Sequence, residues 1–435
     1  MPKSLPLQKR SVAIALTLLL LAILTVIKSR SIPGYDQYGY DLMPTYYGCK
    51  VLASGAGDQL FARDRATNLT ISSAWDRQLT NGARTYKGPA YVQTPLWAWS
   101  LQPACRTMGW YPFRFIFLLL LCLSTSLCLY LVARYWAPHL FTIPWVVLCY
   151  LALYVAEPYR YSIALVQTHM IFILLALAAI LLARREKEVL AGILLALAAV
   201  VKISPGLLVI YWLFTRRYRA AASFFVTLIL LFGATVLAVG PHLTATFLHE
   251  LNQFTSSIFL AYNNQSLAAW WMGRGMPNTY LFNWALHYLP PWLKTLSALL
   301  AIASAAFGGY MDHTDRDRNG RDSSIPYGAI FAILGITVFS VVSWSHYAII
   351  LIFPIMLLLD RFLANRTQKP YVWLATAAAI YLLTVRPLIV HAVANAAYYW
   401  HGIQLTIVRG IFYATLLAMA SLIALRYTES PQPSD

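Results

Sequence analysis

Long apolar runs separated by polar segments recur along the whole sequence. Many runs reach about 20 residues, which as a helix cross a hydrocarbon layer roughly 30 Å thick. Basic residues fall mainly at the ends of the runs, and basic ends of short loops are expected on the cytoplasmic side. With Lys3, Lys9 and Arg10 in the cytoplasm, this pattern predicts ten full spans, at residues 11–27, 114–133, 141–156, 163–183, 220–239, 290–310, 326–342, 346–360, 371–390 and 403–425.

One apolar segment does not fit a simple crossing. Residues 189–214 have basic residues beyond both ends, so both ends are expected in the cytoplasm. The segment is too short for two full crossings, which need about 40 residues. Its middle reads Lys202-Ile-Ser-Pro-Gly, a helix breaker beside an ionisable residue. We therefore expect a broken hairpin of two half-helices, with the freed backbone groups satisfied by protein or water.

The same pattern leaves two long polar segments outside the cytoplasm, residues 28–113 and residues 240–289. The first is a large extracytoplasmic loop in which we expect short juxtamembrane helices. The prediction is therefore an all-α polytopic membrane protein, with residues 1–435 forming a single integral membrane domain.

Composition excludes a water-soluble globular enzyme. Hydrophobic residues make up 59% of the chain and charged residues only 11%, whereas roughly a quarter of an ordinary soluble domain is charged. The net charge of +17 would suggest a nucleic-acid partner in a soluble protein. However, the sequence has no basic stripe interleaved with exposed aromatic residues. We therefore expect these charges to face the headgroups of the lipid bilayer and predict no nucleic acid as a partner.

The five cysteines include no C-x-x-C pair, so they indicate neither a metal nor a redox centre. Cys122, Cys128 and Cys149 lie in apolar runs, where cysteine behaves as a packing residue. Cys49 and Cys105 share the first loop and could pair if that loop is extracytoplasmic, because disulfides persist in oxidising compartments.

The predicted topology brings polar residues from distant parts of the chain to the outer face. They are Asp36 and Asp41, Gln167 and His169, Lys202, the segment 263–266, Arg274 and the segment 343–347. Several have an ordinary structural explanation: aspartate caps helices, and histidine or glutamine hydrogen-bonds between helices. Lys202 is the hardest to explain in this way, because an ammonium at membrane depth is costly without a partner or water.

Together these residues suit a sugar transfer. A carboxylate takes a proton from an attacking hydroxyl, and Lys202, Arg274 and His346 would stabilise charge on a departing phosphate. The sequence has no G-x-x-x-x-G-K-[ST] or G-x-G-x-x-G element for a nucleotide. Because an outward-facing enzyme has no supply of nucleotide sugars, we expect a donor carried by the membrane.

Five segments, in order along the chain, resemble glycosyltransferase family 87. These membrane enzymes belong to the GT-C class and include actinobacterial polyprenyl-phosphate-mannose-dependent mannosyltransferases. The segments are Asp41-Leu-Met-Pro-Thr-Tyr-Tyr with Gly55, Thr94-Pro-Leu-Trp through Pro103, Gln167 through Arg219, Asn264-Gln-Ser-Leu with Arg274, and Ser343-Trp-Ser-His-Tyr. One departure is Pro44, which stands where the family has an apolar residue.

The resemblance implies a GT-C fold and an inverting transfer of a sugar, with mannose expected, from polyprenyl phosphate to an extracytoplasmic glycan or glycolipid. It implies Asp41 as the general base, with Asp36 left open as an alternative. The implied donor-phosphate contacts are Lys202, His346 and Arg274, and the implied substrate-binding residues are Gln167, Asn264, Gln265, Tyr46 and Trp344. No metal and no cofactor are expected. The expected location is a cell membrane, as a multi-pass protein of the bacterial inner membrane.

A transporter or flippase of a lipid-linked sugar is the main alternative. Broken helices beside a cation at membrane depth also occur in transporters, whose polar groups lie near the midplane between related halves. Here the polar residues fall on the outer side, and no two halves of the sequence match. A non-catalytic scaffold for envelope assembly is a third, weaker alternative.

Overall fold

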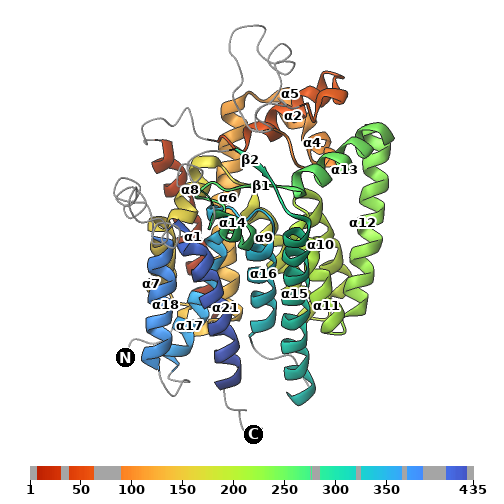
Figure 1. Ribbon diagram of the computed structural model, residues 1–435. Helices are drawn as coiled ribbons and strands as arrows, with labels where there is room; N and C mark the ends of the chain where they lie inside the picture. The colour runs from red at the N-terminus through yellow and green to blue at the C-terminus, as the bar shows by residue number, and fades with distance from the viewer. Residues whose placement is uncertain are drawn as a thin grey trace.

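The computed structural model describes residues 7–30, 39–62, 90–274, 276, 285–319, 325–364, 370–385 and 408–428. These residues form a bundle that is almost entirely helical (Figure 1). Six helices are long and apolar enough to cross a membrane, or seven if one bent pair counts as a span. The prediction of an all-α membrane protein is therefore confirmed, whereas the count of ten spans stays a prediction.

Six predicted spans correspond to the long apolar helices. The matching elements are α1 (Leu7–Arg30), α6 (Trp110–Tyr135), α12 (Tyr218–Val239), α15 (Pro291–Asn319), η6 (Ser345–Leu351) with α17 (Ile352–Leu363), and α21 (Gly410–Thr428). Three further predicted spans are shorter helices in the structure, namely α7 (Ile143–Val155), α16 (Tyr327–Phe339) and α18 (Pro370–Thr384). Residues 386–407, where two predicted spans end and begin, lie outside the described residues.

The remaining span, predicted at residues 163–183, is bent rather than continuous. The helix direction bends by 117° between α8 (Glu157–Leu165) and α9 (His169–Arg184). The break follows from Val166, whose φ of 51° is left-handed and ends α8. The corner leaves Gln167 and Thr168 between the two helices, so His169 begins the long arm.

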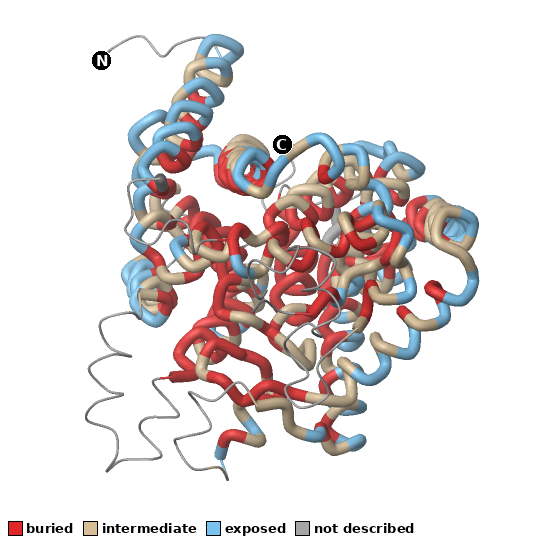
Figure 2. Tube along the Cα trace, turned by 90° about the horizontal axis from the view of Figure 1, so that it is seen from above, coloured by how far each residue is buried: buried red, intermediate tan, exposed pale blue. Residues whose placement is uncertain are grey.

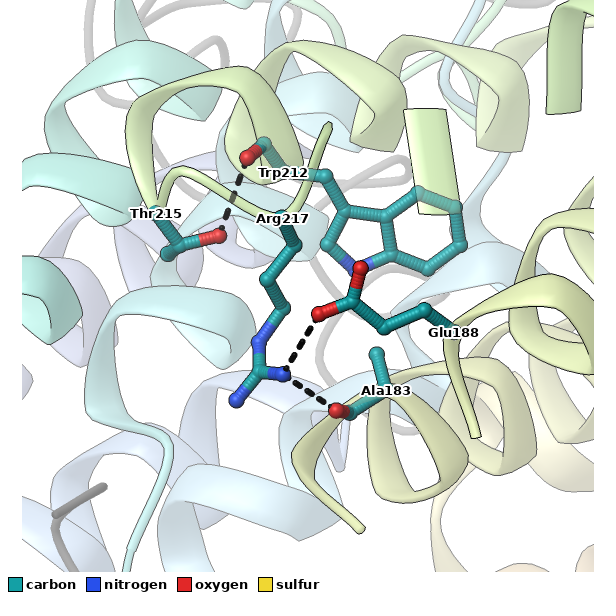
Figure 3. A network of polar contacts seen from close by, with 5 residues as sticks. All are labelled: Ala183, Glu188, Trp212, Thr215 and Arg217. Atoms are coloured by element: carbon teal, nitrogen blue, oxygen red, sulfur yellow. Dashed lines mark hydrogen bonds and ion pairs between the residues drawn. The ribbon is translucent and has the colours of Figure 1, made fainter. Parts of the chain in front are cut away.

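Residues 188–214 contain a break at Lys202. Helix α10 (Glu188–Val201) ends there, and the chain continues through η4 (Ser204–Leu207) into α11 (Leu208–Phe214). Arg217 then donates hydrogen bonds to the Ala183 carbonyl and to Glu188 Oε1 (Figure 3). The segment thus returns to the polar end from which it started, and Lys202 lies far from that end.

The short elements gather at the upper end of the bundle in Figure 1. They are α2 (Met43–Ala53), η2 (Gly57–Gln59), α4 (Pro95–Ser100), α5 (Gln102–Thr107), α13 (Pro241–Thr255), α14 (Leu267–Gly273) and the antiparallel pair β1 (Ser257–Phe259) and β2 (Leu286–Tyr288). A disulfide between Cys49 and Cys105, with Cα atoms 6.4 Å apart, joins α2 to α5. The pairing that the sequence left open is therefore present. A further short element, η3 (Pro138–Leu140), follows α6.

Buried residues fill the middle of the bundle, and exposed residues cover its periphery (Figure 2). On α12 most exposed residues beyond Arg219 are themselves apolar, with Leu237 89% and Ile229 70% exposed. An apolar outer face is expected of a helix that lipid surrounds. Inside, α15 and α16 approach so closely that a Cβ atom on Gly308 would overlap the Gly328 carbonyl, which is typical of small-residue packing between membrane helices.

Candidate active site

A cavity of about 1460 Å³ lies between the short elements at the upper end of the bundle and the long helices. Side chains from the first loop, the α8–α9 corner, the α10–η4 break and η6 line one part of it. The predicted site residues Asp41, Gln167, Lys202, Trp344 and His346 all contribute to this lining. Asp41 and His346 are 305 positions apart in the sequence, so the fold brings these residues together.

Asp41 is held at the α8–α9 corner by its neighbours. The amide of Gly39 donates to the Ala164 carbonyl at 2.8 Å, and Gln167 Nε2 donates to Asp41 Oδ2. Burial raises the pKa of the Asp41 carboxyl to about 7, although the Gln167 hydrogen bond and the charge of Lys202 both oppose the rise. A carboxylate with a pKa near neutrality is suited to act as a general base.

Lys202 reaches the same cavity from the end of α10. Its Nζ lies 3.1 Å from the centroid of the Tyr347 ring and 5.4 Å from that of Phe172. Within the described ranges, no carboxylate forms an ion pair with this ammonium. Aromatic faces offer a partial substitute for an anion, so Lys202 remains available to a negatively charged group in the cavity.

Two histidines stand beside Lys202. His346 of η6 is 1% exposed and His169 of α9 is 2% exposed, and their ring centroids are 5.7 Å apart. Both line the cavity. Among the described residues, neither ring nitrogen of either histidine has a hydrogen-bond partner. Among the described residues, the lining therefore includes the Asp41 carboxylate, the ammonium groups of Lys202 and Lys294, and two imidazoles without hydrogen-bond partners; Lys294 Nζ donates to Ser256 Oγ at 2.9 Å.

Asn264 and Gln265 are not among the residues that line the cavity. Asn264 Nδ2 donates to the Phe259 carbonyl at 2.9 Å, and its Oδ1 accepts from the Ser343 amide at 3.0 Å. Gln265 Nε2 donates to the Val408 carbonyl at 2.9 Å. Both side chains therefore form hydrogen bonds with backbone groups. An isolated β-bridge also joins Asn264 to Trp344. Asn264 thus holds the segment that leads to His346, whereas the Gln265 side chain joins its own segment to the residues at the start of α21.

Three other predicted residues also lie away from the cavity lining or outside the described chain. Tyr46 packs against Phe113, with ring centroids 5.0 Å apart, and its hydroxyl donates to the Met108 carbonyl at 3.0 Å. Arg274 is exposed, with its guanidinium 5.2 Å from the centroid of the Trp270 ring. Asp36 lies outside the described residues, so its standing as the alternative base stays open.

Arg409 supports the site, although the sequence patterns did not single it out. It is fully buried and donates to the carbonyls of Leu260 at 2.9 Å, Ala261 at 3.1 Å, Ala269 at 3.4 Å and Asn264. An arginine inside a predicted apolar span was the available signal, because such a charge needs partners at that depth. Arg409 thus fixes the loop that Asn264 joins to Trp344.

No metal centre is evident in the part of the chain that the structure describes. No three His, Cys, Asp or Glu side chains there lie close enough together to hold an ion. The expectation that the protein uses no metal stays a prediction.

Comparison with known families identifies the chain. The profile of glycosyltransferase family 87 matches residues 91–334, more than half of the 435 residues. The match includes Gln167, His169 and Lys202, whereas Asp41 and His346 lie beyond its two ends. No functionally curated protein matches the sequence. The chain belongs to glycosyltransferase family 87 and is a glycosyltransferase of the membrane.

Proposed function

We propose that this protein is an inverting GT-C glycosyltransferase that moves a sugar, mannose first among the candidates, from polyprenyl phosphate to a hydroxyl of an extracytoplasmic glycan or glycolipid. The observation that carries the proposal is the joint lining of one cavity by the Asp41 carboxylate, the Lys202 ammonium and the His346 imidazole. A transfer from a phosphate leaving group needs a base for the acceptor and positive or hydrogen-bonding groups for the phosphate.

The apolar part of the cavity supports a lipid-borne donor. Phe172, Ile173 and Ala176, which follow His169 along α9, line it together with Ile333 and Ile336 of α16. Because a helix rises about 1.5 Å per residue, this wall reaches about 10 Å below His169. An apolar channel next to a group of polar side chains suits a prenyl chain whose phosphate lies at the polar end.

The reaction can be written with these side chains. Asp41 takes the proton of the acceptor hydroxyl while the acceptor oxygen forms a bond to the anomeric carbon of the sugar. The bond from that carbon to the phosphate oxygen breaks, and its electron pair stays on the oxygen. The phosphodiester anion thereby becomes a phosphomonoester dianion, and Lys202 and His346 stabilise the added charge.

We assign the remaining predicted residues by their positions. Gln167 and Trp344 line the cavity and are proposed to contact substrate. Asn264, Gln265 and Tyr46 are proposed to support the site through the backbone contacts described above. Arg274 is exposed outside the cavity lining, so we leave it out of the proposed donor contacts.

The Cys49–Cys105 disulfide supports an extracytoplasmic active site. Structural disulfides persist in oxidising compartments and are rare in the cytosol, and α2, which carries Cys49, begins two residues after Asp41. We therefore propose that the first loop and the cavity mouth face outward from a bacterial inner membrane. Ten full spans and one broken hairpin remain part of this proposal.

The decisive experiment uses the purified protein in detergent with a radiolabelled polyprenyl-phosphate sugar and candidate glycolipid acceptors. We expect labelled product from the wild type, and at least about a hundredfold less from Asp41→Asn, because removing a general base typically costs that much. The exposed carboxylate of the same loop serves as the control in the Asp58→Asn variant, which should keep its activity.

Product made without a sealed membrane excludes transport as the sole activity. If no polyprenyl-phosphate sugar is consumed by the folded wild type, the proposed donor is wrong. If Asp41→Asn keeps near-normal turnover, the assignment of the base is wrong.

A further inference from the structure

His169 is a buried histidine that the reaction above does not yet use. It begins α9, lines the cavity and is 2% exposed. Neither of its ring nitrogens has a hydrogen-bond partner among the described residues. A buried polar group without a partner is unfavourable. A ligand in the cavity that accepts a hydrogen bond would remove this cost.

The surroundings of His169 specify the charge of that ligand. The Lys202 ammonium lies over Tyr347, whose ring centroid is 5.5 Å from that of His169. His346 stands 5.7 Å from His169, again between ring centroids, and has no partner either in the described chain. The N-terminus of the 16-residue helix α9 adds partial positive charge. All of these groups favour an anion.

Asp41 is the carboxylate that lines the same cavity, and Gln167 holds one of its oxygens. The anion next to His169 is therefore expected to come from the substrate rather than from the described protein. Because this step rests on the proposed function, the candidate is the phosphate of the prenyl carrier.

The charge of this phosphate changes during the reaction. The donor is a phosphodiester with one negative charge, and the released prenyl phosphate is a monoester with up to two. Hydrogen bonds to an ionised acceptor are stronger than those to a neutral one. A hydrogen-bond donor of the protein placed next to the oxygen that gains charge consequently binds the product, and the transition state before it, better than the substrate.

We propose that His169 is this donor: its imidazole N–H gives a hydrogen bond to the phosphate oxygen that receives the electron pair when the sugar leaves. The proton stays on the imidazole, so no further acid or base is needed. Lys202 and His346 bind the phosphate in both states, whereas His169 distinguishes the monoester from the diester. His169 is thereby a catalytic residue specific to the leaving group.

The test compares affinities for the two phosphate forms. We would measure kcat, the KM for the polyprenyl-phosphate sugar, and the inhibition constant of sugar-free polyprenyl phosphate. In His169→Phe, which keeps a planar ring without a donor, we expect kcat to fall and the inhibition constant to rise by about tenfold, the loss of one charge-assisted hydrogen bond. The donor KM should change by less than about twofold.

Two further variants complete the design. His169→Gln carries an amide donor and should recover part of the product affinity. His242→Gln removes an exposed histidine of α13 and should leave all three values unchanged. If His169→Phe does not fold, as judged by thermal unfolding in detergent, His169→Met replaces it as the variant without a donor.

The outcomes separate this inference from the proposed function. If the folded wild type neither uses polyprenyl-phosphate sugar nor is inhibited by polyprenyl phosphate, the proposed function fails. Suppose instead that the wild type does both. If His169→Phe or His169→Met then raises the KM for the polyprenyl-phosphate sugar and the inhibition constant of polyprenyl phosphate by equal factors, or changes neither, only the role of His169 is wrong.

Discussion

At the residue scale, burial determines how Asp41 behaves as a base. The carboxyl has a pKa raised to about 7, chiefly because burial disfavours its charged form. Only the ionised carboxylate accepts a proton, so the transfer rate should rise as pH increases through about 7 and level off above it. Initial rates measured between pH 5 and pH 9 under limiting donor would show this profile.

Substitution of Gln167 should shift the midpoint of the pH profile in a direction that the structure predicts. Its hydrogen bond favours the ionised carboxylate and lowers the pKa of Asp41. In Gln167→Leu the midpoint of the pH profile should therefore move upward, whereas Asp58→Asn should leave it in place. A midpoint that moves downward or stays fixed in Gln167→Leu would contradict the assignment of the profile to Asp41.

Loss of folding can be distinguished from loss of chemistry in the same series. Because the pKa in the folded state is raised, the stability that protonated Asp41 contributes is lost as pH rises through about 7. Asp41→Asn cannot ionise, so at pH 8 it should unfold at a temperature no lower than that of the wild type. Inactivity of a variant with this stability is then a chemical effect.

At the element scale, Arg409 connects α21 to the site. It directly precedes α21, the last described helix, and donates to four carbonyls within residues 260–269, the segment that Asn264 joins to Trp344 ahead of His346. Lysine has no planar fork, so Arg409→Lys should lose several of these bonds. We expect a loss of about 2 kcal/mol in stability, measured by chemical denaturation in detergent.

Function should change as well if this loop positions His346. The donor KM of Arg409→Lys is expected to rise severalfold, whereas the exposed Arg219→Lys variant should match the wild type in both measurements. Equal stability and equal donor KM in Arg409→Lys and the wild type would exclude the positioning role.

Sequence patterns predicted some elements and not others, for identifiable reasons. The break at Lys202 was predictable, because basic residues at both ends and a Ser-Pro-Gly sequence leave few alternatives. The bend at Val166 was not, because a left-handed backbone at a β-branched residue is set by tertiary contacts rather than by local preference. The places of Asn264 and Gln265 depend on backbone groups of distant segments, which no local pattern encodes.

At the scale of the whole molecule, the topology brings the site together. Apolar runs and flanking charges predicted most helices, and they placed Asp41, Lys202 and His346 toward one end. The same topology placed His169 and Tyr347 on the outer side, but their meeting in one cavity could not be derived from it, because that depends on the bend between α8 and α9 and on the packing of η6 beside it. The sequence therefore indicated at which end of the bundle the site lies, whereas the packing of the helices determines which side chains line the cavity.

The proposed sidedness can be tested by cysteine labelling in intact cells. The free cysteines Cys122, Cys128 and Cys149 are buried, so new exposed thiols should dominate the reaction with a membrane-impermeant maleimide. Asp58→Cys in the first loop and His242→Cys at the start of α13 replace exposed residues on the side of the cavity mouth. Lys187→Cys replaces an exposed residue at the opposite end of α10 from Lys202.

We expect the first two variants to react in intact cells and Lys187→Cys to react only after the membrane is permeabilised. The reverse pattern would place the cavity mouth in the cytoplasm, where a lipid-borne donor would have no advantage over a nucleotide sugar.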